Sequence, residues 1–210
     1  MERISNYEVT KRRVQSEFLK YDQEKMIRKF ALKFDENYLY IKFIGHLYRI
    51  HRNTGFLEWS EDDFKTCIEA GFNEALTIYD LLCDSREYCH AAGEYTNLKS
   101  LSALQSGSKK LGDGLFENLG RVFDHKEEAL CMACERLGGN KKGKGDVAYE
   151  LPLFEFLPCM IQFWNSDEEF EASLQIFFDK NVLDFIRYET VWYAANHLMK
   201  RLKEEVEQMF

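Results

Sequence analysis

Residues 146–189 read DVAYELPLFEFLPCMIQFWNSDEEFEASLQIFFDKNVLDFIRYE, and this stretch decides the fold that we expect. Apolar and polar residues alternate in VAYEL at 147–151, as they do in a half-buried strand. CMIQFW at 159–164 is apolar enough to be a strand that is buried on both faces. Pro152 and Pro158 bound the corner between these segments. The stretch therefore begins with a predicted strand pair.

The second part of the same stretch predicts helices. Ser166 and Glu169 form a capping box, which is typical of a helix start. The helix that follows would bury Phe170, Leu174 and Phe177. We expect Asn181 to end this helix and a long final helix to run nearly to the C-terminus.

The rest of the chain predicts an α+β fold, with helices packed on a small, mainly antiparallel sheet. Residues 38–44 alternate with a period of two, and turns at Gly45 and 53–55 predict a meander of three antiparallel strands. Ser60 and Asp63 predict a helix start after the meander. We expect one domain over 1–210, with N-terminal helices at 1–36, the meander at 37–60, a helical region at 61–137 with a mobile loop at 106–114, the strand pair at 146–164 and C-terminal helices at 166–209.

The composition indicates a soluble protein of the cytoplasm. The 210 residues carry a formal net charge of -8, which disfavours a nucleic-acid partner because phosphates need a field of Lys and Arg. No apolar run approaches the ~18 residues of a membrane-spanning helix, so we expect no membrane partner. The start, MERISNYEVTKRR, lacks the apolar core of a signal peptide. The six cysteines are therefore expected as free thiols in a reducing compartment.

Several motifs of this chain are shared with a known family. They are YDQEKMIRKF at 21–30, YLYIKFIGHLYRI at 38–50 with Gly45 and Tyr48, Gly138-Gly139 ahead of Asp146, DEEF at 167–170, Phe178-Asp179 and Tyr188-Glu189. On these motifs the chain resembles the domain-of-unknown-function 3786 family over roughly Tyr21 to Leu202. That family is found largely in anaerobic bacteria and archaea. The resemblance implies a fold and that habitat, but no mechanism.

Four carboxylates are candidates for a functional cluster. Asp146, Asp179 and Glu189 stand beside apolar stretches and belong to the motifs of the resemblance. Glu169 opens an expected helix, where negative charge complements the macrodipole and needs no further explanation. Two such carboxylates converging in a cleft could perform acid–base chemistry or bind a hard cation. The sequence alone leaves both interpretations open.

A glycine- and lysine-rich segment is a second candidate. GGNKKGKG at 138–145 has the G-x-x-x-x-G-K spacing of a phosphate-binding loop, but Gly145 replaces the Ser or Thr that holds Mg²⁺. The segment also follows a helix and precedes a strand, which is the reverse of the usual order. Its amides could form an anion-binding nest beside Lys141, Lys142 and Lys144, or it could be a solvated basic loop.

The remaining motifs do not predict a catalytic residue, a metal or a cofactor. Cys131 and Cys134 have the spacing of zinc knuckles and redox sites, but no second pair is in that register. Both fall within an expected helix, where two thiols on a buried face are the simpler interpretation. The histidines form no ligand spacing, and no G-x-S-x-G motif is present.

We expect a non-catalytic module that binds a small ligand or a protein. Its pocket would be lined by Tyr40, Tyr48, Phe154 and Trp164, which equally well could be ordinary core residues. One alternative is an enzyme that uses the carboxylate cluster, with or without a metal. Another is a structural homodimer.

The dimer alternative depends on the last helix. Apolar residues recur there with a 3,4 spacing that is typical of a heptad seam. Its C-terminal half contains Met199, Leu202, Val206 and Met209, flanked by charged residues. The same seam could instead pack inside a single chain.

Overall fold

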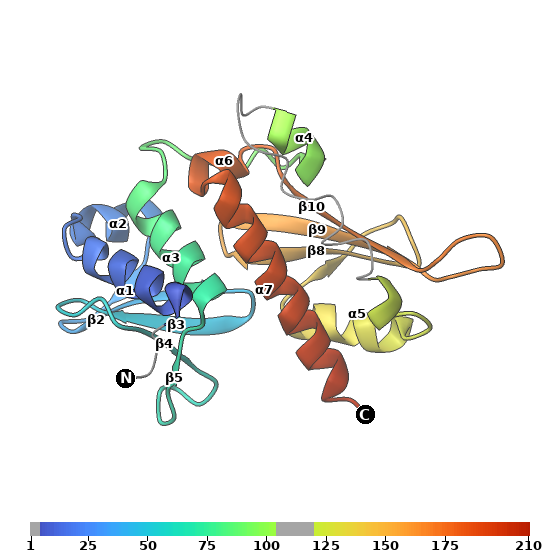
Figure 1. Ribbon diagram of the computed structural model, residues 1–210, viewed down its shortest axis with the longest axis horizontal. Helices are drawn as coiled ribbons and strands as arrows, with labels where there is room; N and C mark the ends of the chain where they lie inside the picture. The colour runs from blue at the N-terminus through green and yellow to red at the C-terminus, as the bar shows by residue number, and fades with distance from the viewer. Residues whose placement is uncertain (1–4, 104–119) are drawn as a thin grey trace. The chain divides into compact units, whose positions relative to one another are not determined.

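The computed structural model describes residues 5–103 and 120–210 (Figure 1). Its residues group into two compact units. Unit 1 comprises Met1–Cys89 and Leu183–Ala194, and unit 2 comprises His90–Val182 and Ala195–Phe210. The expected α+β class is confirmed, with a long C-terminal helix, α7 (Tyr188–Glu207). That both units form the single domain expected from the sequence stays a prediction.

The helices of unit 1 begin where the sequence indicates. Ser5 caps α1 (Asn6–Phe18) by accepting a hydrogen bond from the amide of Glu8. Asp22 caps α2 (Gln23–Phe30) in the same way, accepting from Lys25 at 3.0 Å. A third helix, α3 (Phe72–Asp84), packs on α1, and the rings of Phe18 and Tyr79 lie 5.8 Å apart.

The strands of unit 1 form an antiparallel sheet, and the predicted meander is its centre. The pairing order is β5-β4-β3-β2, with β1 also on β2. The strands are β1 (Lys33–Phe34), β2 (Tyr38–Phe43), β3 (His46–His51), β4 (Leu57–Ser60) and β5 (Ile68–Glu69). Burial alternates along β2 and β3, so one face, with Leu39 and Ile50, belongs to the core. In Figure 1 the three helices lie over one side of these strands.

Unit 2 contains a second run of antiparallel strands, paired in the order β7-β8-β9-β10-β6. Its strands are β6 (Tyr95–Asn97), β7 (Asn140–Lys141), β8 (Val147–Phe154), β9 (Leu157–Trp164) and β10 (Ser173–Asp179). Its helices include α4 (Leu98–Ala103), the 3₁₀ turn η2 (Gly120–Val122) and α5 (Glu127–Arg136), which packs on β8. The predicted strand pair is therefore confirmed, although each strand is longer than expected.

The helix predicted after Ser166 is wrong. Ser173–Asp179 is the strand β10, paired along its length with β9. Of the residues expected on its buried face, Leu174 is buried, whereas Phe170 is exposed and Phe177 is half-buried. Phe178 is buried instead, four residues after Leu174, which fits the period of two of a strand. Pairing with β9 favours the strand over the helix, because it satisfies the backbone of both strands. The C-terminal region at 166–209 is therefore helical only from α6 (Val182–Phe185) onward, with a break before α7.

Three further details differ from the expectation. Burial in β9 alternates strictly, so this strand has one core face instead of two. Pro152 and Pro158 lie inside β8 and β9 as partners, at a site where the ladder is irregular. A Pro–Pro pair has no amide donors to lose, which makes this position suitable for both residues.

The predicted helical region at 61–137 contains more strand and loop than expected. No helix starts at Ser60, because Asp63 and Phe64 have positive φ values of 54° and 60°, which an α-helix does not allow. β5 and β6 also lie in this region. The mobile loop expected at 106–114 lies outside the described residues. Among the described helices, none has the length and apolar character needed to cross a bilayer.

Candidate functional site

Asp179, one of the predicted functional carboxylates, has a structural role. Its side chain is fully buried at the end of β10. It accepts hydrogen bonds from the amides of Ala92, Gly93 and Asn181 at 3.0, 2.9 and 2.8 Å. These three amide donors compensate for the loss of water around the buried negative charge. Asp179 therefore fastens the segment before β6 to the end of β10.

Asp146 also organises backbone, at the opposite end of the same strands. Its Oδ2 accepts from the amide of Asn165 at 2.8 Å. The Asn165 side chain in turn bonds Glu127 and accepts from the amide of His125. The predicted carboxylate thus belongs to a polar cluster that includes Asn165, which sequence spacing did not single out.

This polar cluster contains a Ser, a His and an Asp without the geometry of a hydrolase triad. The Ser166 hydroxyl donates to Asp124 at 2.7 Å, and His125 Nε2 lies 3.4 Å from the same hydroxyl. In a triad the imidazole stands between the hydroxyl and the carboxylate and takes the proton. Here the carboxylate holds the hydroxyl directly, and accepting from Ser166 lowers the pKa of Asp124.

The four predicted carboxylates do not form one cluster. Asp146 and Asp179 lie at opposite ends of the unit 2 strands, as the pairing of β8, β9 and β10 requires. Glu169 is exposed in the β9–β10 turn, and Glu189 is exposed on α7 in unit 1. Across residues 5–103 and 120–210, no group of three or more His, Cys, Asp or Glu side chains could hold a metal ion.

The predicted aromatic pocket is not assembled either. Tyr48 and Phe154 are buried core residues, with 0% and 1% of their surface exposed. Tyr40 pairs with Arg49 while Tyr48 pairs with Ile41, which places the two tyrosines on opposite faces of the β2–β3 pair. Trp164 is half-buried at the end of β9. Tyr48 and Phe154 are therefore ordinary core residues, which is the alternative that the sequence left open, whereas Tyr40 and Trp164 are half-buried.

The basic segment at 138–145 contains a two-residue strand, β7 (Asn140–Lys141), at its centre. Lys141 belongs to β7, and the amide of Lys142 donates to the carbonyl of Ala148. The amide of Gly139 donates to the carbonyl of Cys134. Lys142 also pairs with Glu150 at 3.5 Å. The amides of Gly139 and Lys142 are therefore bonded to carbonyls and not turned toward an anion, whereas the side chains of Lys141 and Lys144 remain exposed.

The cysteines are free thiols, as expected. Cys131 and Cys134 lie in the middle of α5, and burial raises the pKa of the Cys134 thiol. Burial likewise raises the pKa of Cys159. A thiol that stays protonated is neither a nucleophile nor a good metal ligand, which favours the packing interpretation of the Cys131–Cys134 pair.

The heptad seam of the last helix is largely inaccessible. Met199, Leu202 and Val206 are buried in a single chain, and Met209 is half-buried. Arg201 is buried as well and donates to Glu205 at 2.9 Å. Burial of Met199, Leu202 and Val206 favours the intramolecular interpretation of the spacing, and a dimer through this helix stays an untested prediction.

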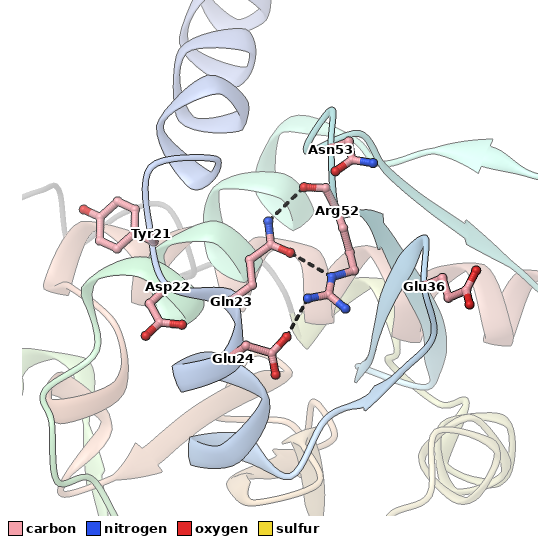
Figure 2. A pocket seen from close by; sticks show the side chains of 7 residues that line it. All are labelled: Tyr21, Asp22, Gln23, Glu24, Glu36, Arg52 and Asn53. Atoms are coloured by element: carbon pink, nitrogen blue, oxygen red, sulfur yellow. Dashed lines mark hydrogen bonds and ion pairs between the residues drawn. The ribbon is translucent and has the colours of Figure 1, made fainter.

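Unit 1 contains a cleft that the sequence did not indicate (Figure 2). We call it the Arg52 cleft. It is open to solvent, has a volume of about 430 Å³, and is lined by Tyr21, Asp22, Gln23, Glu24, Glu36, Arg52 and Asn53. These residues come from the start of α2, the β1–β2 turn and the β3–β4 turn. The amide of Arg52 donates to the carbonyl of Asn37 at 2.8 Å, which joins the two turns.

Arg52 is held in place by its neighbours in the cleft. Figure 2 shows Gln23, Glu24 and Arg52 turned toward one another. Arg52 Nε donates to Gln23 Oε1 at 3.1 Å, and its terminal nitrogen lies 2.6 Å from Glu24 Oε1. Gln23 Nε2 donates back to the Arg52 carbonyl at 2.8 Å. A third bond goes to the carbonyl of Asp35. The guanidinium is thus already satisfied by the protein.

The charge of the cleft is therefore negative. Its lining contains three carboxylates and one cation. Asp22 is occupied as the helix cap and Glu24 by Arg52, but both are exposed and keep acceptor capacity toward solvent. Glu36 is also exposed, on the other side of Arg52 in Figure 2. Such an arrangement favours a cation over an anion.

Tyr21, which lines the cleft, also contacts a second ionic group, formed by Asp80, Asp84 and Arg187. The Tyr21 hydroxyl donates to Asp84 at 3.0 Å, and this hydrogen bond raises the pKa of Tyr21. Asp84 also binds Arg187, whose Nε lies 2.7 Å from the buried Asp80. Arg187 stands in the break before α7, so α3 holds this break through two carboxylates one helical turn apart.

A family model described as a domain of unknown function, DUF3786, matches residues 22–201. The chain belongs to this family. The match confirms the resemblance seen in the motifs and its extent. The DUF3786 region begins at Asp22 and contains every residue of the Arg52 cleft except Tyr21. Comparisons with curated proteins and with solved structures found no match.

Proposed function

We propose that this DUF3786 chain is a non-catalytic binding module that takes an amine or guanidinium group of its ligand in the Arg52 cleft. One observation carries the proposal: three carboxylates and an arginine that is already bound line a single open cleft. An incoming cation meets acceptor oxygens there without having to displace a strong partner. The overall charge of -8 would attract such a ligand from a distance.

The chemistry of the lining supports binding rather than catalysis. The seven lining residues include no His, Cys, Ser or Lys. General acid–base and nucleophilic catalysis depend mostly on such groups or on carboxylates in unusual surroundings. The three carboxylates here are solvent-exposed. An enzyme built on Asp146, Glu169, Asp179 and Glu189, and a dimer built on the last helix, have no comparable observation in their favour.

We also infer that the module works in the cytoplasm. All six cysteines are unpaired, and burial keeps several of them protonated. Unpaired thiols are typical of proteins in reducing compartments. An anaerobic habitat, which the family resemblance suggests, would preserve them in the same state.

Calorimetric titration with two probes, L-argininamide and spermidine, tests the proposal. Asp22→Asn and Glu36→Gln each remove one charge from the cleft, and Asn can still act as a helix cap. We expect each variant to weaken binding about 3- to 5-fold, because a single charge contributes about 1 kcal/mol at close range in water. Glu207→Gln is the matched control, since Glu207 is an exposed carboxylate of unit 2 that pairs with Lys203.

The outcome separates a specific site from general charge attraction. If the cleft is the site, binding weakens in Asp22→Asn and Glu36→Gln and stays unchanged in Glu207→Gln. Equal weakening in all three variants would mean that the probes respond only to net charge. Tighter binding of an anionic probe such as succinate would contradict the proposal.

A further inference from the structure

The DEEF motif at 167–170 lies outside the Arg52 cleft and has no part in the function proposed above. Asp167–Phe170 forms the tip of the β9–β10 hairpin, which extends past the other strands of unit 2 in Figure 1. We call these four residues the acidic tip. Asp167 closes it, because its Oδ1 accepts from the amides of Glu169 and Phe170, each at 2.8 Å. The amide of Asp167 also donates to the carbonyl of Phe170 at 2.9 Å.

The rest of the acidic tip points to solvent. Phe170 is 69% exposed, so its phenyl ring is accessible to a partner. Within the described residues, the side chains of Glu168 and Glu169 make no hydrogen bond or ion pair. The turn is therefore closed by one carboxylate, and it presents two more carboxylates and a phenyl ring outward.

A basic segment lies at the same end of unit 2. The amide of Asp146 donates to the carbonyl of Phe163, and Asp146 Oδ2 accepts from Asn165, the residue that starts the hairpin connection. Just before Asp146, Lys144 is exposed, and Lys141 is exposed in β7, opposite Tyr149 of β8. One end of unit 2 thus carries both the acidic tip and a pair of lysines.

We propose that this end of unit 2 binds the same end of a second copy of the chain. A twofold axis places each acidic tip against the lysines of the other copy, since one patch that carries both signs of charge is self-complementary. The two contacts are then equivalent, and Phe170 of each copy is removed from water. Local charge pairing is needed here, because two copies that each carry a charge of -8 otherwise repel.

Two charge-reversed variants of the full chain test this interface. Glu168→Lys/Glu169→Lys makes the tip basic, and Lys141→Glu/Lys144→Glu makes the basic segment acidic. All four residues are exposed, so both variants should fold. We expect sedimentation at low salt to give about twice the 24.9 kDa chain mass for the unchanged protein and a dissociation constant at least about tenfold higher for each variant alone. Phe170→Ala should also weaken association.

Mixing the two variants gives the decisive result. In the mixed dimer the reversed tip of one copy meets the reversed segment of the other, and the second contact keeps its original charges, so we expect association to return to the level of the unchanged protein. A destabilised fold would not be rescued in this way. A monomeric unchanged protein, variants that associate normally, or a mixture that stays monomeric would each overturn the proposal. The Arg52 cleft in unit 1 is unaffected by these changes, so its binding of argininamide is measured independently.

Discussion

Asp179 is a fully buried carboxylate whose three partners are backbone amides of two separate segments. Asp146 likewise holds the start of the β9–β10 connection through Asn165. Both residues belong to motifs that resemble the family pattern. In the structure each carboxylate accepts hydrogen bonds from backbone amides, which accounts for an acidic residue at both positions.

Asp179→Asn tests this structural role. The Asn side chain keeps the shape of Asp179, but its NH₂ group would face the backbone N–H donors that Asp179 binds. We therefore expect the free energy of unfolding to fall by about 2–3 kcal/mol. Urea denaturation followed by circular dichroism measures the loss. Glu189→Gln, at an exposed position of α7, is the control and should stay within about 0.5 kcal/mol. Equal stability of Asp179→Asn and the unchanged protein would show that the hydrogen bonds to Asp179 contribute nothing.

The thiols should differ in reactivity according to burial. Cys67 is exposed, whereas Cys134 and Cys159 are buried and have raised pKa values. We expect a maleimide reagent at pH 8 to label Cys67 first and to leave Cys134 and Cys159 unlabelled until denaturant is added. Mass spectrometry of the digested protein identifies the labelled sites. Rapid native labelling of Cys134 would support a redox role for the Cys131–Cys134 pair.

Cys83 predicts a pH dependence of stability. Burial raises its pKa from 9.0 to about 12. The folded protein thus holds the thiol proton of Cys83 more tightly than the unfolded chain does. The resulting contribution of Cys83 to the free energy of unfolding is fully present below pH 9 and is lost as pH rises toward 12. Comparing the urea stability of the unchanged protein and Cys83→Ala from pH 8 to about 11 isolates this effect. Parallel pH profiles of the two proteins would show that Cys83 does not titrate as described.

At the level of elements, the sequence correctly predicted the helix caps and strands that depend on interactions between residues close in the chain. Ser5 and Asp22 cap their helices, and the period of two over 38–51 became β2 and β3. The capping box at Ser166 failed because Ser173–Asp179 gains more from pairing with β9 than from a helix. Ser60 failed because the residues after it adopt positive φ values, which no capping pattern reveals.

The last helix shows the same ambiguity at the level of packing. A 3,4 spacing indicates an apolar seam but not whether its partner belongs to the same chain. Since Leu202 is fully buried in one chain, Leu202→Ala should cost about 2–5 kcal/mol, and this loss should not depend on protein concentration. Lys203→Ala, at the exposed neighbouring position, is the control. Thermal denaturation over a wide concentration range measures both, and a loss that shrinks at high concentration would indicate an intermolecular seam.

Across the whole molecule, the Arg52 cleft could not be predicted because its parts are remote in sequence. Residues 21–24, 36 and 52–53 meet only through the cap of α2 and the pairing of β1, β2 and β3. No motif connects them, and Arg52 follows a strand as many surface arginines do. The acidic composition disfavoured a nucleic-acid partner, but composition does not locate a site.

Chemical-shift mapping tests the central claim most directly. L-argininamide is added to the ¹⁵N-labelled full chain, and the amide shifts are followed residue by residue. The account predicts saturable shifts at 21–24, 36 and 52–53, which weaken in Glu36→Gln and vanish at high salt as an exposed charge interaction should. Shifts that avoid these residues, or that spread over all acidic surfaces without saturating, would contradict it.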